Sequence, residues 1–364
     1  MSPDEMSVEE FTYEALPIRV LFGAGRSTAL AGEVERLGLD RVLVLSTLEQ
    51  TVMAETIAAA LGDRSAGLFP GARMHVPVGV VDAVSAHARE VGADGCVAVG
   101  GGSTVGLGKA LALRHGLPMI AVPTTFAGSE MTPIWGLTEN GVKRTGRDAA
   151  VLPRSVVYDP ELLTTLPVGL AVTSGLNAVA HAVEGLYAPD TSPIVELMAE
   201  AGVRALTSAL PEIAAEPDAL APRSEALRGA WLCGAVLGAT TMSLHHKLCH
   251  VLGGTFDLPH AQVHTVVLPH VVAFNAPGAP RAMAALRRVL GDDPAAALFD
   301  LASRLGAPTS LAAIGMPAGA LPDVVRQVVD QPYANPRAVT AENLSALLSD
   351  AQRGVRPGRH RART

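Results

Sequence analysis

The sequence has few aromatic residues, few charged residues and no excess of positive charge. Phe, Trp and Tyr together make up 4% of the 364 residues, and 28 Lys and Arg face 35 Asp and Glu, for a formal net charge of −7. A nucleic-acid-binding protein normally carries a basic excess, so this composition disfavours that class. Hydrophobic residues make up 49% and charged residues 17%, which excludes a disordered or fibrous chain.

Segments that would direct the chain out of a reducing compartment are also missing. The three cysteines, Cys96, Cys233 and Cys249, form no CxxC pair and cannot build a disulfide framework. The first 11 residues are acidic and contain no apolar stretch of the kind found in a signal peptide. Residues 229–244 are nearly uncharged but shorter than the roughly 20 residues that cross a bilayer. We therefore expect a cytoplasmic protein and a buried helix at 229–244.

The first half of the chain alternates short apolar runs with helical patterns. A length of 364 residues fits two domains. Alternation of this kind predicts an α/β domain with a parallel, doubly wound sheet that is covered on both faces and binds ligands beyond the carboxyl ends of its strands. The predicted strands are 41–46, 95–99 and 119–122, and the predicted helices are 48–61, 80–91 and 103–114.

After about residue 160 the strand patterns stop. Apolar residues recur there at spacings of three and four, which predicts an all-α domain. We expect a dinucleotide-binding α/β domain at 1–160, a helical substrate and catalytic domain at 161–357, and a frayed Arg-rich tail at 358–364. The predicted helices are 170–186, 193–210, 223–244, 263–274, 281–290, 293–305 and 341–352.

A glycine-rich segment follows the predicted strand at 95–99. Gly100, Gly101 and Gly102 lead through Ser103 into a helix. Glycines let the backbone approach a phosphate, and a helix N-terminus supplies free N–H groups. Ser103 is expected to cap this helix and to donate to a phosphate oxygen. The spacing matches neither the P-loop nor the Rossmann fingerprint, and a tight turn is the alternative interpretation.

Two further segments lie at the same predicted sheet edge. Thr124, Thr125 and Ser129 follow the strand at 119–122, and their hydroxyl groups could form the other wall of a coenzyme cleft. The first predicted strand ends at Ser46, with no acidic residue to bind a ribose 2′-hydroxyl group. This absence predicts weak discrimination between NADH and NADPH.

Histidines gather in the helical half. His246 and His250 lie one helical turn apart, and His260 opens the next helix after Gly253 and Gly254, which are expected to end the first one. Farther upstream, Asn177 and His181 are four residues apart. Three nitrogen ligands for a divalent metal could come from His181, His246 and His260, although a lone histidine in a helix is more often a core residue.

Two residues near these histidines argue against a metal. Asn177 stands where a carboxylate would complete a shell of three histidines and one acid, and a neutral amide oxygen is a poorer ligand for a cation. Lys247 adds a positive charge directly after His246. A cation there disfavours a metal and favours an anionic substrate, unless Lys247 is simply a solvated surface residue.

Taken together, these motifs resemble the iron-containing (group III) alcohol dehydrogenase superfamily, and within it the maleylacetate reductase branch. The resemblance runs from about residue 11 to residue 357, and it includes the segments 11–25 and 143–154. The motifs that carry it are Gly100–Ser103, Thr124–Thr125, Gly128–Glu130, Asn177 with His181, and His246 with His250 and His260.

The resemblance implies a two-domain enzyme, usually a homodimer, that binds NADH or NADPH between its domains. The superfamily's metal ligands fall on Asn177, His181, His246 and His260, and the missing acid puts iron or zinc in doubt, so we expect no metal. His250 matches a further active-site histidine. The coenzyme-binding residues would be Ser46, Gly101, Gly102, Ser103, Thr124, Thr125 and Ser129.

The expected reaction is the reduction of maleylacetate, a small dicarboxylate, to 3-oxoadipate in the breakdown of aromatic compounds. The catalytic residues would be His181, His246, His250, His260 and Lys247, and Lys247, Lys143, Arg147 and Asn177 would bind the substrate. A metal-dependent alcohol dehydrogenase, a lyase of the dehydroquinate synthase type and a catalytically silent nucleotide-binding protein are the alternatives.

Overall fold

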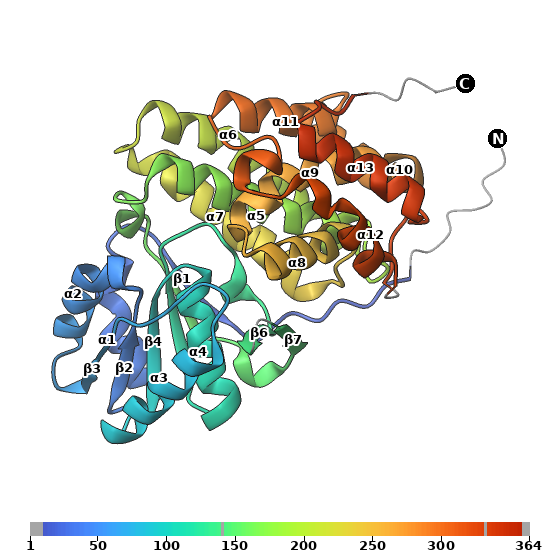
Figure 1. The fold of residues 1–364 in the computed structure, drawn as a ribbon. Coiled ribbons are helices and arrows are strands. Elements are labelled where there is room, and N and C mark those ends of the chain that lie inside the picture. Colours follow the sequence, from blue (N-terminus) through green and yellow to red (C-terminus); the bar gives the residue numbers. More distant parts are fainter. Residues whose placement is uncertain (1–9, 140–141, 331–332, 359–364) are drawn as a thin grey trace, which may run out of the picture.

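The computed structural model describes residues 10–139, 142–330 and 333–358 and has two domains, one α/β and one helical (Figure 1). Six parallel strands form the sheet of the first domain in the order β1-β8-β5-β4-β2-β3. This arrangement confirms the predicted fold class. The strands are β1 (Arg19–Phe22), β2 (Val42–Leu45), β3 (Ser65–Phe69), β4 (Gly95–Gly100), β5 (Met119–Pro123) and β8 (Ser155–Tyr158).

Helices cover both faces of this sheet because alternate strand residues point to opposite sides. Val42 and Val44 pack with apolar side chains of α1 (Leu30–Arg36) and α2 (Thr51–Leu61). Leu43 and Leu45 belong to the cluster that contains side chains of α3 (Val78–Glu90) and α4 (Gly102–His115). Strands β2, β4, β5 and β8 are buried on both faces, whereas β1 and β3 at the edges of the sheet are partly exposed.

An antiparallel hairpin projects from the α/β domain beside the helical one (Figure 1). It consists of β6 (Ile134–Glu139) and β7 (Val142–Arg147) and was not predicted. Its outer end is fastened to the turn before α3, because Thr138 donates from Oγ1 to the carbonyl oxygen of His75 at 2.8 Å. The hairpin is therefore held to the α/β domain away from its base as well.

The second domain consists of packed helices, as predicted from about residue 160. Its largest cluster of buried side chains continues from the sheet into α5, α6 and α7 and so joins the two domains. The helices are α5 (Val168–Leu186), α6 (Pro193–Ala215), α7 (Leu220–Ala239), α8 (Leu244–Phe256), α9 (His260–Asn275), α10 (Pro280–Leu290), α11 (Pro294–Arg304), α12 (Leu321–Val329) and α13 (Ala341–Arg353).

A pair of glycines brings the two domains into backbone contact. A Cβ added to Gly128, whose φ is +75°, would lie 3.0 Å from the Cα of Gly234 on α7. One added to Gly234 would lie 2.6 Å from the carbonyl oxygen of Gly128. Only glycine at both positions allows this approach, which sets the distance between the loop after β5 and the helical domain.

Some expected boundaries were wrong. The helix predicted at 223–244 ends at Ala239, and a separate helix, α8, starts at Leu244. Gly253 and Gly254 do not end α8, which continues to Phe256 and stops where Asp257 adopts a left-handed conformation, φ +52° and ψ +36°. The free energy gained by burying apolar side chains of α8, such as Leu248 and Leu252, exceeds the cost of placing two glycines in a helix.

The predicted tail at 358–364 begins with the last residue that the structure describes. Residues 359–364 of that tail lie outside the described residues. Before them, Arg356 forms a two-point ion pair with Asp300 of α11 at 2.7 Å, so the described chain remains attached to the domain up to this point. None of the helices in the described part of the chain is long and apolar enough to cross a membrane.

Candidate active site

The glycine-rich segment lies where β4 leads into α4. Gly100 has φ +156°, and a Cβ added to Gly101 would lie 2.9 Å from Cγ2 of Thr125. At Gly102, the first residue of α4, an added Cβ would meet nothing closer than 4.0 Å. No side chain in the described chain caps this helix, so the N–H groups of its first turn are available to an anion.

Ser103 does not cap α4 as expected. The capping position is Gly101, in an extended conformation, and the helix begins one residue earlier than predicted. Ser103 lies inside the first turn, where its hydroxyl group remains beside the free N–H groups. A contact between Ser103 and a phosphate stays a prediction.

The loop after β5 forms the neighbouring wall. The Thr124 N–H donates to the carbonyl oxygen of Gly100 at 3.1 Å, which ties the two loops together. The Thr124 hydroxyl group accepts a hydrogen bond from Nε2 of Gln50, so it is already in use within the protein. At the end of β2, Ser46 is fully buried and its Oγ has no partner in the described chain.

A buried lysine that the sequence analysis did not single out fixes this loop. Nζ of Lys109, on α4, donates to the carbonyl oxygens of Ser129, Thr132 and Ile134 and to the Thr132 hydroxyl group at 2.7–2.8 Å. Burial lowers the pKa of Lys109 to about 7. The helix that presents Gly102 therefore also sets the path of the loop containing Ser129.

Helices α5, α8 and α9 bring the predicted polar residues of the helical domain together. Asn177, His181 and Glu184 follow one another at spacings of four and three on α5, so they share a face. His246 of α8 stacks against His181, with ring centroids 5.0 Å apart. His260, at the start of α9, stacks against His250 at 6.5 Å.

Four ring nitrogens form a hydrogen-bonded chain between two acceptors. His181 Nε2 lies 3.1 Å from the carbonyl oxygen of Ala127, and His181 Nδ1 lies 2.9 Å from His246 Nε2. His246 Nδ1 lies 2.7 Å from Oε2 of Glu184. All four nitrogens of the two rings are therefore engaged within the protein.

His246 lies between the ring of His181 and the carboxylate of Glu184. Burial, and then the neighbouring His246, lower the pKa of His181 well below its ordinary value. Burial alone would raise the pKa of Glu184, but its hydrogen bond from His246 and nearby charges outweigh burial and lower the pKa to about 2. The site therefore contains a buried carboxylate that is hydrogen-bonded to an imidazole ring.

Glu184 also organises the start of α8. Its carboxylate accepts the N–H groups of Ser243 at 2.9 Å, His245 at 2.8 Å and His246 at 3.3 Å. A carboxylate at a helix N-terminus is stabilised by the helix dipole. Sequence reasoning missed Glu184, and its only signal was an acidic residue three positions after His181 in an otherwise apolar helix.

The predicted metal ligands fit a divalent cation poorly. Nδ1 of His181 and Nε2 of His246 are bonded to each other, and a metal could use both only after that bond breaks and a proton leaves. The Asn177 amide oxygen is buried and has no partner among the described residues, but it carries no formal charge. Among the described residues, the carboxylate that is bonded to these rings is Glu184, which bonds to Nδ1 of His246, whereas Nε2 of His246 faces His181. These residues thus offer imidazole nitrogens and a neutral amide oxygen in place of the expected charged oxygen ligand.

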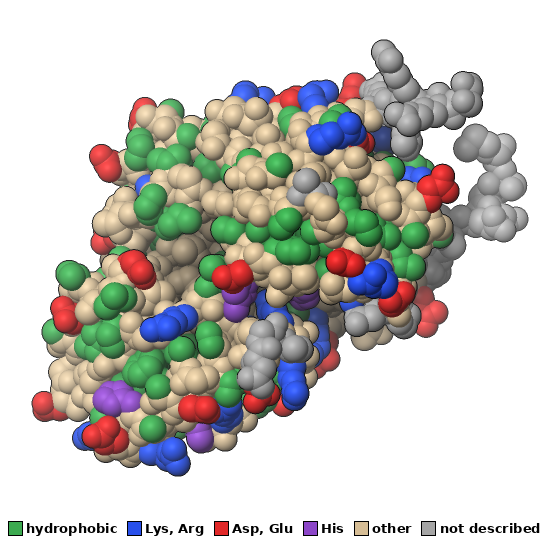
Figure 2. All heavy atoms as spheres, in the orientation of Figure 1, with side chains coloured by type: hydrophobic (Ala, Val, Ile, Leu, Met, Phe, Trp, Pro, Cys, Tyr) green, Lys and Arg blue, Asp and Glu red, His purple; other side chains and the backbone are tan. Residues whose placement is uncertain are grey.

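His250, His260 and Lys143 face the seam between the domains. His250 is exposed and His260 half-buried, and Figure 2 shows histidine side chains reaching the surface along this seam. Desolvation, and then the charge of Lys143, lower the pKa of both histidines. Lys143 extends from the hairpin across Gly136, where its Cε would lie 3.4 Å from an added Cβ.

The structure separates the remaining predicted cations. Lys247 is on α8 beside His246 and is half-buried, and burial lowers its pKa. The guanidinium group of Arg147 donates to the carbonyl oxygens of Gly238 at 2.7 Å and Thr240 at 3.1 Å, at the end of α7. Arg147 thus has a structural task in joining the hairpin to the helical domain, which the sequence did not indicate.

Comparison with known proteins identifies the class to which this fold and site belong. The profile described as iron-containing alcohol dehydrogenase matches residues 17–160, and the profile for the C-terminal part of the Fe-containing alcohol dehydrogenase family matches residues 171–352. The chain belongs to this family and is an oxidoreductase, as the motifs predicted.

Relatives within the family carry a more particular name. The chain is 56% identical to a maleylacetate reductase of Sphingobium indicum over 349 residues, which are 96% of this chain and 99% of that protein. The crystal structure of maleylacetate reductase from Agrobacterium tumefaciens is similar with a TM-score of 0.92 and 51% identity, over 96% of this chain and all of that one. A putative alcohol dehydrogenase from Ralstonia eutropha gives a TM-score of 0.95 at 56% identity, with the same coverage.

Proposed function

We propose that this protein is a maleylacetate reductase that uses NADH or NADPH to reduce maleylacetate to 3-oxoadipate. Sequence identity of 50–56% with proteins of that name over nearly the whole chain supports the assignment. The observation that carries it in the site itself is the buried hydrogen bond between His246 and Glu184, together with a neutral amide, Asn177, on the same face of α5 as His181 and Glu184.

Coenzyme binding follows from the two loops at the sheet edge. The pyrophosphate group would lie at the N-terminus of α4, against the N–H groups that follow Gly101 and beside Ser103. Thr125 and Ser129 would line the other side. Because Ser46 replaces an acidic residue at the end of β2, we expect little discrimination against the 2′-phosphate of NADPH. When bound, the reduced coenzyme supplies a hydride.

Residues of this chain would stabilise the negative charge of the enolate and supply the proton. Addition of a hydride to the alkene carbon β to the ketone turns the ketone oxygen into an enolate oxygen, which needs positively charged or N–H donors. Because all four ring nitrogens of His181 and His246 are already hydrogen-bonded within the protein, His260 would provide an N–H donor for this oxygen. His250, open to the seam and stacked against His260, would pass a proton to the α-carbon as the carbonyl group re-forms and take one up from water at its other ring nitrogen. One hydride and one proton balance the reduction.

The two carboxylates of the substrate need cationic partners. Lys143 faces His250 and His260 from the hairpin, and Lys247 lies next to His246, so the two ammonium groups approach from opposite domains. Asn177 offers a neutral amide within the same region. Because Arg147 is bonded to the end of α7, we assign it to support of the hairpin and not to the substrate.

The deciding experiment is an NADH oxidation assay of the purified protein with maleylacetate, run beside a panel of simple aldehydes. Turnover of maleylacetate that survives dialysis against a chelator supports both the assignment and the metal-free site. Preference for an aldehyde, with loss of activity after dialysis, would instead indicate a metal-dependent alcohol dehydrogenase. Conversion of a substrate without net consumption of NADH would indicate a lyase. A homodimer in the cytoplasm remains a prediction, which light scattering tests for the assembly.

A further inference from the structure

His264 is the point at which the histidine rings of the site meet. Its ring lies edge-on to four other imidazoles, at interplanar angles of 63–75°. The centroid distances are 4.4 Å to His260, 4.8 Å to His245, 5.1 Å to His246 and 6.0 Å to His181. Three of these four rings belong to the proposed catalytic machinery, whereas His264 itself is fully buried.

Local sequence spacing explains this position. His264 follows His260 by one turn of α9, so its ring lies directly behind that of His260. His245 precedes His246 on α8, and helices α8 and α9 pack against each other. A second layer of histidines thus backs the layer that faces the seam.

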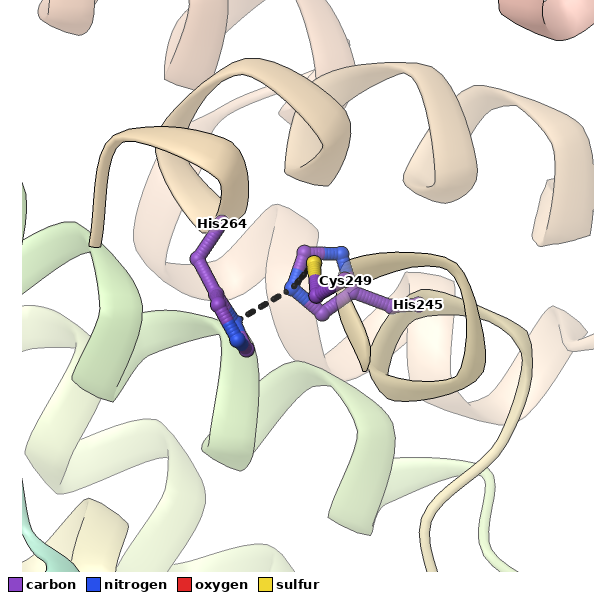
Figure 3. Close-up of side chains that lie close together, drawn as sticks. All are labelled: His245, Cys249 and His264. Atoms are coloured by element: carbon purple, nitrogen blue, oxygen red, sulfur yellow. Dashed lines mark hydrogen bonds between the residues drawn. The ribbon is translucent and has the colours of Figure 1, made fainter. Parts of the chain in front are cut away.

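One hydrogen bond fixes the second layer. His264 Nδ1 lies 2.9 Å from His245 Nε2, and Sγ of Cys249 lies 3.6 Å from the same nitrogen (Figure 3). All three residues are fully buried. Figure 3 shows the two rings meeting from different helices, with Cys249 behind the ring of His245. The ring of His264 therefore has one defined orientation.

We propose that His264 is a positioning residue for the reaction, and that its ring fixes the orientations of the His246 and His260 imidazoles. This inference rests on the proposed function of the site. The imidazoles of His246 and His260 can rotate about their side-chain bonds, and the edge of His264 occupies the space into which they would turn. A reacting group displaced by about 1 Å can lower a rate by about a hundredfold, so the packing of this ring affects turnover without contact with substrate.

Two substitutions separate the ring from its hydrogen bond. His264→Phe keeps an aromatic ring in place but loses the bond to His245, and it should lower thermal stability while retaining most of the turnover. His264→Asn places an amide near the position of Nδ1 and keeps that bond but removes the ring. It should lower kcat by roughly ten- to a hundredfold and leave the KM for NADH unchanged.

His270 provides a matched control on the same helix. It is also buried, and its ring contacts Phe299 at 6.4 Å instead of the catalytic histidines. His270→Asn makes the same exchange and should leave kcat unchanged. Equal losses in His264→Asn and His270→Asn would overturn the proposal, as would normal turnover in His264→Asn or a His264→Phe variant as slow as His264→Asn.

Metal analysis of the wild-type protein gives an independent test. His245 Nε2, Cys249 Sγ and His264 Nδ1 lie within 4.8 Å of one another, which is close enough for one ion to bind all three. A bound metal there would replace the hydrogen bond between the rings and overturn the proposal. Failure of the proposed function would look different, because the wild-type protein itself would then leave NADH unchanged in the presence of maleylacetate.

Discussion

The imidazole of His75 and the carboxylate of Asp257 face each other between the two domains, with His75 Nε2 3.6 Å from Asp257 Oδ1. His75 belongs to the turn before α3, and Asp257 ends α8. Both have positive φ, +64° and +52°, as does Val76 at +48°. Among the described residues other than glycine, these three alone have this conformation. Backbone strain of this kind concentrates at functional sites. Here the strained residues of the two domains lie beside the proposed substrate cleft.

The strain at Asp257 predicts opposite effects of two substitutions. The side chain of Asp257 is 88% exposed, so removing it loses few contacts. Asp257→Val should destabilise the protein by about 1–2 kcal/mol, because a β-branched residue is poorly compatible with a left-handed backbone. Asp257→Gly should leave stability unchanged or raise it. Urea unfolding measures both, and equal destabilisation would contradict the assigned backbone conformation.

Replacement of His250 tests the proton donor. His250→Asn should reduce kcat with maleylacetate by roughly 10²–10⁴, the range expected for loss of a general acid. NADH binding, followed by fluorescence titration, should not change, since the expected coenzyme contacts are on the α/β domain. Turnover near the wild-type rate would remove His250 from this role.

Lys143 and Lys247 are expected to bind carboxylates and can be compared directly. Lys143→Met should raise the KM for maleylacetate by about tenfold or more, consistent with roughly 1.5–3 kcal/mol for a charge-assisted hydrogen bond. Lys143→Arg should recover part of the affinity, because it keeps the charge. Lys247→Met gives the same measurement for the second ammonium group. An unchanged KM in both Met variants would show that neither lysine binds the diacid.

Gly102 allows coenzyme binding to be tested without disturbing the fold. An added Cβ has open space at Gly102 but is 2.9 Å from Thr125 at Gly101. Gly102→Ala should therefore keep the melting temperature and weaken NADH binding, because its methyl group occupies the approach of the phosphates. Gly101→Ala should lower both. Full NADH affinity in a stable Gly102→Ala variant would place the pyrophosphate elsewhere.

Buried neutral histidines predict loss of stability in mild acid. Burial lowers the pKa of His245 to about 3, whereas the unfolded chain takes up this proton near pH 6.5. Stability is therefore lost as the pH falls from about 6.5 towards 3. Between pH 7 and 5.5 one such residue contributes about 1 kcal/mol. In this pH interval the unfolding free energy of His245→Phe, measured with urea, should decrease by about 1 kcal/mol less than that of the wild-type protein.

The carboxyl group of Glu184 affects the unfolding free energy only at lower pH. The pKa of Glu184 is lowered to about 2, so its contribution is present above pH 4.5 and disappears as the pH falls towards 2. The slope of unfolding free energy against pH between pH 7 and 5.5 should thus be the same in Glu184→Gln as in the wild-type protein. An unfolding free energy that did not vary with pH in this interval would contradict the neutral state of His245.

Local patterns predicted strands β2, β4 and β5 of the sheet and most helices, but not strands β1, β3 and β8. Strand β4 and helix α5 follow from continuous or periodic apolar residues, and their structural bounds differ from the predicted ones by one or two residues. Strand β1 was missed because it is four residues long and only partly buried. The hairpin was missed because its side chains are mixed and its position depends on contacts with distant segments.

In the site, too, some residues could be predicted from local spacing, whereas others depend on contacts between distant segments. Spacing predicted that His181, His246 and His260 could converge, and the structure places the rings of His181 and His246 in contact and joins His260 to them through His264. Glu184 could not be predicted, because the three N–H groups that it accepts lie about 60 residues away in the sequence. The fixed bonds of Arg147 likewise depend on where α7 ends, which the apolar pattern did not show.

Lys109 connects the proposed coenzyme-binding helix to the hairpin that is proposed to bind the substrate. Its ammonium group extends from α4, whose first turn is the proposed phosphate site, to the carbonyl oxygens of Ser129 and Ile134 at the root of the hairpin that contains Lys143. If α4 shifts when nucleotide binds, these hydrogen bonds would transmit the shift to the hairpin. Nucleotide bound first would then set the position of Lys143 before a diacid arrives, which favours an ordered sequence of binding.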